Sequence, residues 1–245
     1  MAEPQTTLLS ASGIEKRFGA LTVLAGVDFK LGAGESVGMV GPNGAGKTTL
    51  LNILSGSTSP NSGRVEFEGL DVTRRGAAAR CRLGIGRAHQ IPRPFGGMTV
   101  FENVFVGATA GAGKRGREAY ARVADVLVQC RIEELANRRA DSLGLLHRKR
   151  LEMARALATG PRVLLLDEIG AGLTDAEATE LVQTIAELRA AGVAIVWIEH
   201  VVHVLLQAID RLVCLDGGRV IADGDPQTVM KSAAVIDAYL GSSAA

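Results

Sequence analysis

Cysteine, aromatic residues and net charge are all scarce in this chain of 245 residues, which has three cysteines, 4% aromatic residues and a formal net charge of +1. So little net charge creates no global field that would favour nucleic acid or anionic lipid. The cysteines form no CxxC pair or Cys/His cluster, which argues against a disulfide framework or a zinc site. We therefore expect Cys81, Cys130 and Cys214 to be small buried side chains in a reducing compartment.

Long apolar runs are absent as well, although 47% of the residues are hydrophobic. The longest, Val163–Leu166 and Val193–Ile198, are far shorter than the roughly 20 residues that a membrane-spanning helix needs. The N-terminal segment lacks the basic, apolar and cleavage regions of an export signal. Two basic clusters, 114–117 and 147–150, are typical of solvated faces or helix starts. The hydrophobic residues are therefore expected to form the core of one α/β domain.

The segment Gly41–Thr49 fits the pattern G-x-x-x-x-G-K-[ST] without mismatch. A strand-like run, Ser36–Val40, precedes it and a helical run, Thr49–Ser55, follows. In that order, backbone N–H groups and a helix N-terminus converge on phosphate oxygens, and glycines allow the close approach. A chance match in a glycine-rich chain is the alternative, and the flanking strand and helix oppose it. The residues expected to hold the phosphates are Gly41, Pro42, Asn43, Gly44, Ala45, Gly46, Lys47, Thr48 and Thr49.

A nucleoside triphosphate with Mg²⁺ is the ligand that this loop predicts. Lys47 is expected to reach the β- and γ-phosphates, and the Thr48 hydroxyl to ligate Mg²⁺. Four apolar residues, Val163–Leu166, then end in Asp167 and Glu168. A buried strand that delivers a carboxylate to the sheet edge indicates Asp167 as a second Mg²⁺ ligand. Glu168, one residue on, is expected on the other side of the strand, where it could orient or deprotonate water.

The rest of the pattern alternates strands and helices, so the predicted fold class is α/β with a mostly parallel sheet. A capping box, Thr174 with Glu177, precedes one helix. The unpatterned strands 163–166 and 193–198 are expected to be parallel and buried on both faces. The expected strands are 8–14, 23–31, 64–68, 84–87 and the hairpin 212–215 with 220–222. The expected helices are 151–158, 176–190 and two short ones up to 241. The stretch 77–139 is expected to be mostly helical, with a loop at 108–116.

In its order of motifs the chain resembles the ATP-binding subunit of ABC transporters. After the phosphate loop come Gln90, a signature-like stretch at Leu143–His147, Asp167-Glu168, and His200 at the end of an apolar strand. The resemblance covers about residues 8–241. It implies a P-loop NTPase core with an N-terminal antiparallel β subdomain and a helical subdomain at about 91–160, all within a single nucleotide-binding domain, 1–245. The segments 16–19, 98–104, 199–200 and 238–241 are similar to the branched-chain amino acid importer subfamily.

The resemblance also implies roles for single residues. Phe18 would stack on adenine, Gln90 would touch Mg²⁺, the attacking water and the membrane partner, and His200 would contact the γ-phosphate. Each has a plainer alternative: a core phenylalanine, a surface amide and a structural histidine. The signature residues Leu143, Gly144, Leu145, Leu146 and His147 would face the ATP held by a second subunit.

The departures from the family pattern lie mainly in that signature, which is Leu-Ser-Gly-Gly-Gln in the family. Gly144 lacks the serine hydroxyl, and leucines replace both glycines. Ile169 and Gly170 replace the usual Pro and Thr, and Thr174 stands where Asp is usual. Because the signature of one subunit closes on the phosphate loop of another, the altered signature affects the partner's site. A heterodimer with an ATPase that has an intact signature is therefore expected.

The resemblance predicts a cytoplasmic ATPase, peripheral on the inner face of the membrane, that drives import of branched-chain amino acids or related amino acids or amides. Its partners would be the second ATPase, the permease subunits and, indirectly, a periplasmic substrate-binding protein, with no nucleic acid. The segment Ile91–Val104 would touch the permease through Phe95, Met98 and Phe101. Two alternatives stay open: a subunit that binds ATP but hardly hydrolyses it, and a soluble ABC ATPase of DNA repair or translation.

Overall fold

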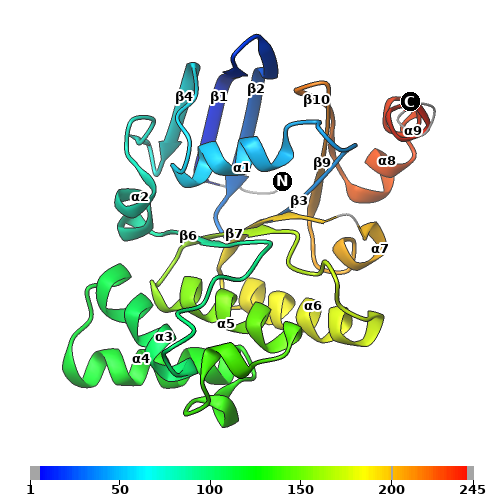
Figure 1. Cartoon of the computed structure of the whole chain (residues 1–245). Helices are drawn as coiled ribbons and strands as arrows, with labels where there is room; N and C mark the ends of the chain where they lie inside the picture. Colours follow the sequence, from blue (N-terminus) through cyan, green and yellow to red (C-terminus); the bar gives the residue numbers. More distant parts are fainter. Residues whose placement is uncertain (1–5, 200, 242–245) are drawn as a thin grey trace.

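Two β-sheets organise the chain (Figure 1), and the computed structural model describes residues 6–199 and 201–241. The larger sheet has the strand order β10-β9-β3-β8-β7-β6. Its strands β9, β3, β8, β7 and β6 are parallel, and β10 joins the edge antiparallel to β9. The strands are β3 (Ser36–Val40), β6 (Ile85–Ala88), β7 (Val163–Asp167), β8 (Ala194–Ile198), β9 (Arg211–Asp216) and β10 (Arg219–Gly224).

Every residue of β3, β7 and β8 is buried, which explains why these strands lack alternation of polar and apolar residues. The helix α6 (Asp175–Ala190) connects β7 to β8, and these strands pair in parallel, as predicted. Thr174 and Glu177 form the predicted capping box at the start of α6. The α/β class with a mostly parallel sheet is therefore confirmed.

The smaller sheet is antiparallel, with the order β2-β1-β4-β5, and confirms the β-rich N-terminal third. Its strands are β1 (Thr7–Phe18), β2 (Leu21–Gly32), β4 (Ser62–Phe67) and β5 (Leu70–Asp71). The helix α1 (Lys47–Ser55) lies between the two sheets (Figure 1). Its buried side chains Leu50, Leu51, Ile53 and Leu54 join one hydrophobic core with the strands of both sheets. That core fixes the position of the loop from which α1 starts.

The second core lies between the larger sheet and the helices on its other face. Phe101, Phe105 and Tyr120 stack on one another where two of these helices meet. The helices on this side are α3 (Val100–Val106), the π-helical turn η1 (Gly107–Gly111), α4 (Gly116–Gln129), the short turns η2 (Glu133–Leu135) and η3 (Ala140–Ser142), α5 (Leu145–Ala158) and α6. The helix α2 (Ala77–Leu83) lies at the β6 edge of the sheet, where its Leu83 packs against the first core. Three further helices, α7 (Val202–Leu205), α8 (Pro226–Met230) and α9 (Ala233–Gly241), complete the C-terminal part.

Three expectations from the sequence are corrected by the structure. The expected loop 108–116 begins as the helical turn η1, where the Thr109 hydroxyl donates to the Phe105 carbonyl at 2.8 Å. The helix α5 begins at Leu145 instead of Leu151, so the basic cluster 147–150 lies at a helix start, one of its two expected places, although Lys149 and Arg150 are buried. Cys130 and Cys214 are buried as predicted, whereas Cys81 is only partly buried.

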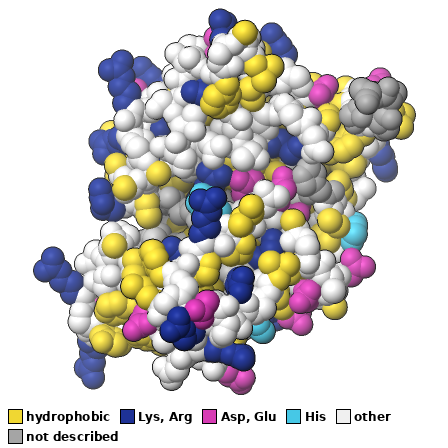
Figure 2. Space-filling model, in the orientation of Figure 1, with side chains coloured by type: hydrophobic (Ala, Val, Ile, Leu, Met, Phe, Trp, Pro, Cys, Tyr) yellow, Lys and Arg dark blue, Asp and Glu magenta, His cyan; other side chains and the backbone are white. Residues whose placement is uncertain are grey.

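Basic and acidic side chains are mixed over the face shown in Figure 2, without a field of one sign. This agrees with the formal net charge of +1. Within the parts that the structure describes, we find no helix with the length and apolar character needed to cross a bilayer.

Candidate functional site

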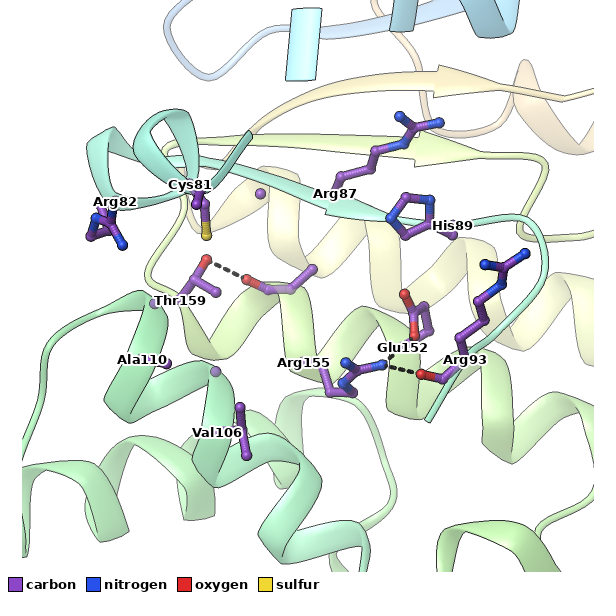
Figure 3. Close-up of a pocket in the computed structure, with 15 residues that line it drawn as sticks. Cys81, Arg82, Arg87, His89, Arg93, Val106, Ala110, Glu152, Arg155 and Thr159 are labelled. Carbon is purple, nitrogen blue, oxygen red and sulfur yellow. Dashed lines mark hydrogen bonds and ion pairs between the residues drawn. The ribbon is translucent and has the colours of Figure 1, made fainter. Parts of the chain in front are cut away.

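Two concave regions flank the strand β6 and the acid pair. The first is a cleft of about 530 Å³ between α2, β6, the α3–η1 segment and α5 (Figure 3). Basic side chains line it, namely Arg82, Arg87, His89, Arg93 and Arg155, and Glu152 pairs with Arg155 at 2.8 Å. The second is a smaller cavity at the phosphate loop, lined by Leu21, Val23, Asn43, Gly44, Ala45, Gly46, Lys47, Thr48, Thr49 and Glu168. Arg87, in the wall of the first region, contacts Asp167, and Glu168 lines the second.

The phosphate loop has a backbone that only glycine can adopt at its two ends. Gly41 and Gly46 have φ values of 141° and 103°. A Cβ atom on Gly41 would lie 2.0 Å from the Leu215 carbonyl oxygen, and one on Gly46 would lie 2.9 Å from the Val23 carbonyl oxygen. The loop is therefore pressed against β9 and β2 on one side, and its other side lines the cavity.

Lys47 is 6% exposed and lies folded onto its own loop. Its ammonium donates to the Gly41 carbonyl at 2.7 Å and to the Pro42 carbonyl at 2.9 Å. Burial lowers the pKa of Lys47, and the nearby groups Glu168, Cys214 and Asp167 act in the opposite direction. The structure thus places a cation in the wall of the cavity, next to the loop's N–H groups.

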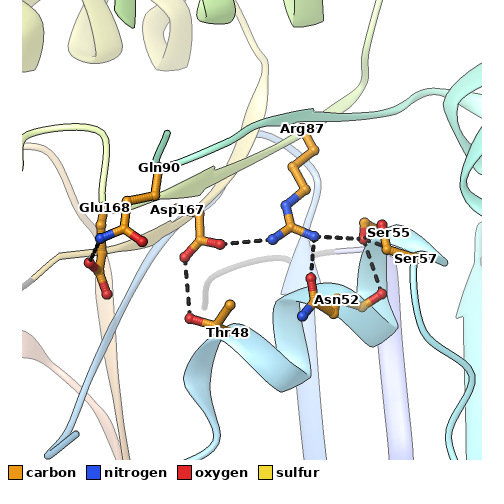
Figure 4. Close-up of polar contacts among 8 residues, drawn as sticks. All are labelled: Thr48, Asn52, Ser55, Ser57, Arg87, Gln90, Asp167 and Glu168. Carbon is orange, nitrogen blue, oxygen red and sulfur yellow. Dashed lines mark hydrogen bonds and ion pairs between the residues drawn. The ribbon is translucent and has the colours of Figure 1, made fainter. Parts of the chain in front are cut away.

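Asp167 ends β7 and faces the start of α1 (Figure 4). The Thr48 hydroxyl donates to Asp167 Oδ1 at 3.5 Å, and Arg87 Nη2 contacts Oδ2 at 2.8 Å. Within the described residues, no three His, Cys, Asp or Glu side chains gather into a metal cage. A hydroxyl and one carboxylate oxygen nevertheless fit Mg²⁺, which prefers oxygen ligands and is usually held by one or two protein groups together with phosphates and water.

Arg87 is a site residue that sequence reasoning missed. It lies on β6, and its Nη1 donates to Asn52 Oδ1 at 2.6 Å and to Ser55 Oγ at 3.2 Å, both on α1. Arg87 therefore ties the carboxylate of Asp167 to the helix that carries the phosphate loop (Figure 4). The only signal in the sequence is an arginine within a short strand of otherwise small and apolar residues, Ile85–Ala88.

Glu168 follows the end of β7 and has a φ of 46°, so strand alternation does not set its direction. Its N–H donates to the Ile198 carbonyl at 2.9 Å, and its side chain lines the cavity that holds Lys47. Asp167 is not among the residues that line this cavity, so the two neighbouring acids face different surroundings. Gln90 Nε2 donates to Glu168 Oε2, so the structure brings these two predicted residues together (Figure 4). His200 lies outside the described residues.

Two buried charged groups brace the turn after Glu168, and neither was predicted. Glu199 accepts a hydrogen bond from the Gly170 N–H at 2.6 Å and one from Trp197 Nε1 at 3.3 Å. A Cβ on Gly170 would lie 2.9 Å from Glu199 Oε1, so glycine at this position leaves room for the carboxylate. From α5, Lys149 donates to the Glu168 carbonyl at 3.4 Å. Burial lowers the pKa of Lys149, while the negative charges of Glu199 and Glu168 oppose that change.

Phe18 is 54% exposed at the end of β1, so the alternative of a core phenylalanine is wrong. Lys16 Nζ lies 5.0 Å from the centre of its ring. The signature-like stretch lies at the start of α5, where Gly144 is the N-cap, Leu143 is buried and Leu145 is exposed. None of its five residues is among those that line the phosphate-loop cavity.

A family model described as "ABC transporter" matches residues 24–171, more than half of the chain. The chain belongs to the ABC transporter family. The predicted P-loop NTPase fold and the resemblance to ATP-binding subunits of ABC transporters are thereby confirmed at the level of the family. A second model, "Branched-chain amino acid ATP-binding cassette transporter", matches residues 219–245.

Curated relatives of this ABC chain include two from amino acid transport systems. It is 35% identical to the high-affinity branched-chain amino acid transport ATP-binding protein BraF of Pseudomonas aeruginosa, over 96% of this chain and 98% of BraF. It is also 35% identical to LivG of Escherichia coli, a protein of the same description, over 98% and 99% of the two chains. A crystal structure of the ADP conformation of MJ1267, an ATP-binding cassette of an ABC transporter, superposes with a TM-score of 0.87 at 31% identity, covering 96% and 99%.

Proposed function

We propose that this chain is the ATP-hydrolysing subunit of an importer of branched-chain amino acids or related amino acids or amides. The observation that carries the proposal is the single cavity in which Lys47, Thr48 and Glu168 converge, with Asp167 directly behind Thr48. A cation, a hydroxyl and two carboxylates in this arrangement are what ATP–Mg²⁺ hydrolysis requires of a P-loop protein. The names of the relatives BraF and LivG support the substrate class.

Each group at the cavity has its own role in the proposed hydrolysis of ATP. The backbone N–H groups of Asn43–Thr49, which line the cavity, and the Lys47 ammonium hold the β- and γ-phosphates and balance the charge that develops on them. Thr48 and Asp167 would hold Mg²⁺, which would neutralise phosphate charge. Glu168 accepts a proton from the attacking water, and Gln90 orients the carboxylate by its hydrogen bond. Phe18 is exposed and pairs with Leu21, which lines the cavity, so its ring is available to stack on adenine.

Uptake measurements in the host test the proposed substrate class. Deleting the gene should lower high-affinity uptake of radiolabelled leucine, isoleucine and valine, and the wild-type gene should restore it. A gene with Glu168→Gln should fail to restore uptake although the protein accumulates normally. Unchanged uptake of all three amino acids and of small amides in the deletion strain would contradict the proposed substrate class.

The cleft of Figure 3 is where we place the permease subunits, which would hold the chain at the inner, cytoplasmic face of the membrane. Ile91, Phe95 and Met98, on either side of the cleft residue Arg93, are exposed at 66%, 44% and 39%. Arg155 holds this segment from α5: its Nη1 donates to the Arg93 carbonyl at 2.8 Å, and its guanidinium lies 4.8 Å from the Phe95 ring. Phe101, expected as a third anchor, packs instead against Phe105 and Tyr120. A loop of the permease seated here would lie next to Gln90, and hence to Glu168.

Cys81 provides a probe for that docking because it lines the cleft and is partly exposed. Cys130 and Cys214 are buried, and burial raises the pKa of their thiols to about 12 and about 11, so both should react slowly. Maleimide should therefore label Cys81 first in the free chain. Assembly with the permease subunits should slow that labelling markedly, whereas an unchanged rate in the assembled complex would refute docking in this cleft.

We further propose that the functional dimer is asymmetric, with a second ATPase that has an intact signature. In a homodimer, each ATP would face Gly144, which has no hydroxyl, and the exposed side chain of Leu145. Pairing with an intact subunit leaves one complete site, made from Lys47 and Glu168 of this chain and the signature of its partner. The alternative is a subunit that binds ATP with little turnover of its own. The altered signature favours this alternative, whereas the position of Asp167 and Glu168 at the phosphate loop opposes it.

A further inference from the structure

The C-terminal helix α9 touches the phosphate loop through one side chain. The Tyr239 hydroxyl accepts a hydrogen bond from the Gly41 N–H at 3.0 Å, across 198 positions of sequence. Gly41 is buried, so no bulk solvent is at hand to accept this hydrogen bond in place of the tyrosine. A buried N–H group that loses its acceptor is destabilising, and the backbone around it shifts to find another.

Gly41 is also the residue that holds Lys47. Its carbonyl accepts from the Lys47 ammonium at 2.7 Å, while its N–H donates to Tyr239. The two hydrogen bonds lie on either side of one Cα atom whose φ, 141°, is open to glycine alone. The close approach to the Leu215 carbonyl prevents any side chain from stabilising this conformation. The contact with Tyr239 therefore supplies a restraint that the glycine itself lacks.

We propose that Tyr239 is a positioning residue of the ATP site, which fixes Gly41 and, through the Gly41 carbonyl, the ammonium of Lys47. The inference rests on the proposed function, since it assumes that the loop binds ATP. Tyr239 touches neither the cavity nor its ligand-facing atoms, and acts by keeping the loop in its binding conformation before the nucleotide arrives. Burial raises the pKa of Tyr239, so its hydroxyl stays neutral at physiological pH.

The contact between Tyr239 and Gly41 should also make α9 respond to ATP. Coupling between two parts of a protein is reciprocal, so a helix that stabilises the binding conformation is itself stabilised when ATP binds. The outer side of α9 exposes Ile236 and Leu240, at 45% and 66%. Occupancy of the phosphate loop should thus be visible in the amide hydrogen exchange of residues 233–241.

The experiment compares Tyr239→Phe with Tyr120→Phe in the purified full-length chain. Each change removes one hydroxyl and keeps the ring, and Tyr120 lies in the stack with Phe101 and Phe105, away from the loop. Tyr239→Phe should weaken ATP binding, measured by calorimetry, about five- to thirtyfold, the range expected when a buried N–H loses its partner. Tyr120→Phe should leave the affinity unchanged. In the assembled ATPase, Tyr239→Phe should raise KM for ATP and largely retain kcat.

The outcomes separate this inference from the proposed function. A wild-type chain that binds no ATP would overturn both, whereas equal affinity in the wild type and Tyr239→Phe would overturn only the role of Tyr239. If Tyr239→Phe also melts at a much lower temperature, its ATP affinity no longer tests the proposal, and amide exchange in the wild-type chain becomes the deciding measurement. Saturating ATP should slow amide exchange in 233–241 more than in α4, and unchanged exchange in α9 would overturn the proposal.

Discussion

Lys47, Asp167 and Glu168 are each held by neighbouring groups, which for the two acids lie outside the linear motifs. Lys47 rests on the carbonyls of its own loop, Asp167 on Arg87, and Glu168 on Gln90. Charged groups that are already oriented need little rearrangement when the substrate binds, which is the main source of electrostatic catalysis. At the scale of residues, the site is therefore preorganised by long-range contacts.

Lys47→Ala should weaken ATP binding about ten- to a hundredfold, because the charge-assisted contacts of the ammonium with the β- and γ-phosphates are lost. Lys30→Ala is the matched control, since Lys30 is exposed on β2. Isothermal titration calorimetry of both variants, with Mg²⁺ present, gives the comparison. An ATP affinity that survives Lys47→Ala unchanged would show that the loop does not bind the triphosphate in this way.

The sequence predicted Lys47, Thr48 and Asp167 because each belongs to a short, contiguous pattern. Arg87 and Tyr239 could not be found in this way, since they meet their partners across 80 and 198 positions. Their placement follows from how β6 and α9 pack. No local spacing in a single sequence reveals that packing. The roles of Gln90 and Phe18 stay predictions, although the structure places Gln90 beside Glu168 and leaves Phe18 exposed.

At the scale of elements, α1 carries the phosphate loop at its N-terminus and is anchored at its other end by Arg80. Arg80 is fully buried, and its guanidinium donates to the carbonyls of Ile53 at 2.6 Å and Leu54 at 2.9 Å. Burial lowers the pKa of Arg80 to about 10, so it remains charged at neutral pH. A cation is favourable at the C-terminus of a helix, where carbonyls lack partners.

Arg80→Met should lower the free energy of unfolding by about 3 kcal/mol, because the last carbonyls of α1 lose their donor in a buried place. Arg82→Met is the matched control, since Arg82 is exposed on the same helix α2. Urea unfolding followed by circular dichroism measures both variants. A loss below about 0.5 kcal/mol for Arg80→Met would mean that α1 is held by its apolar contacts alone.

The helix α5 shows where local pattern fails at this scale. Its predicted start, Leu151, follows the basic cluster, because charged residues interrupt the apolar period. The observed start is Leu145, and the buried charges are satisfied from other elements. Arg150 pairs with Glu180 on α6 at 2.5 Å, and Lys149 reaches the Glu168 carbonyl. Tertiary partners that lie far away in sequence thus override the apparent polarity of the segment.

At the scale of the whole molecule, the asymmetric dimer that we propose gives this chain one complete and one altered half of an ATP site. In that proposal the phosphate loop and acid pair are the complete half, and the start of α5 is the altered one. Gly144 has a φ of −67°, and a Cβ there would meet nothing within 4 Å. A serine would therefore fit at this position without strain.

Restoring the signature should raise hydrolysis by the chain alone. Gly144→Ser combined with Leu145→Gly, Leu146→Gly and His147→Gln should increase the rate about tenfold, since a hydroxyl contact to a charged phosphate contributes roughly 1.5–3 kcal/mol. Replacing Gly144 by Ala instead of Ser, with the other three changes kept, adds a Cβ without the hydroxyl and is the control. Phosphate release at saturating ATP is the measurement, and full turnover by the unmodified chain alone would contradict the asymmetric dimer.

The most direct test of the account is hydrolysis by Glu168→Gln in the assembled ATPase. The amide keeps the shape of the side chain and loses the base, so ATP affinity should be retained. The hydrolysis rate should fall at least about a hundredfold, while Glu187→Gln, an exposed change on α6, should leave it unaltered. The account predicts a nucleotide-bound dimer that does not turn over, and a Glu168→Gln assembly that hydrolyses ATP at a rate comparable with the wild type would contradict it.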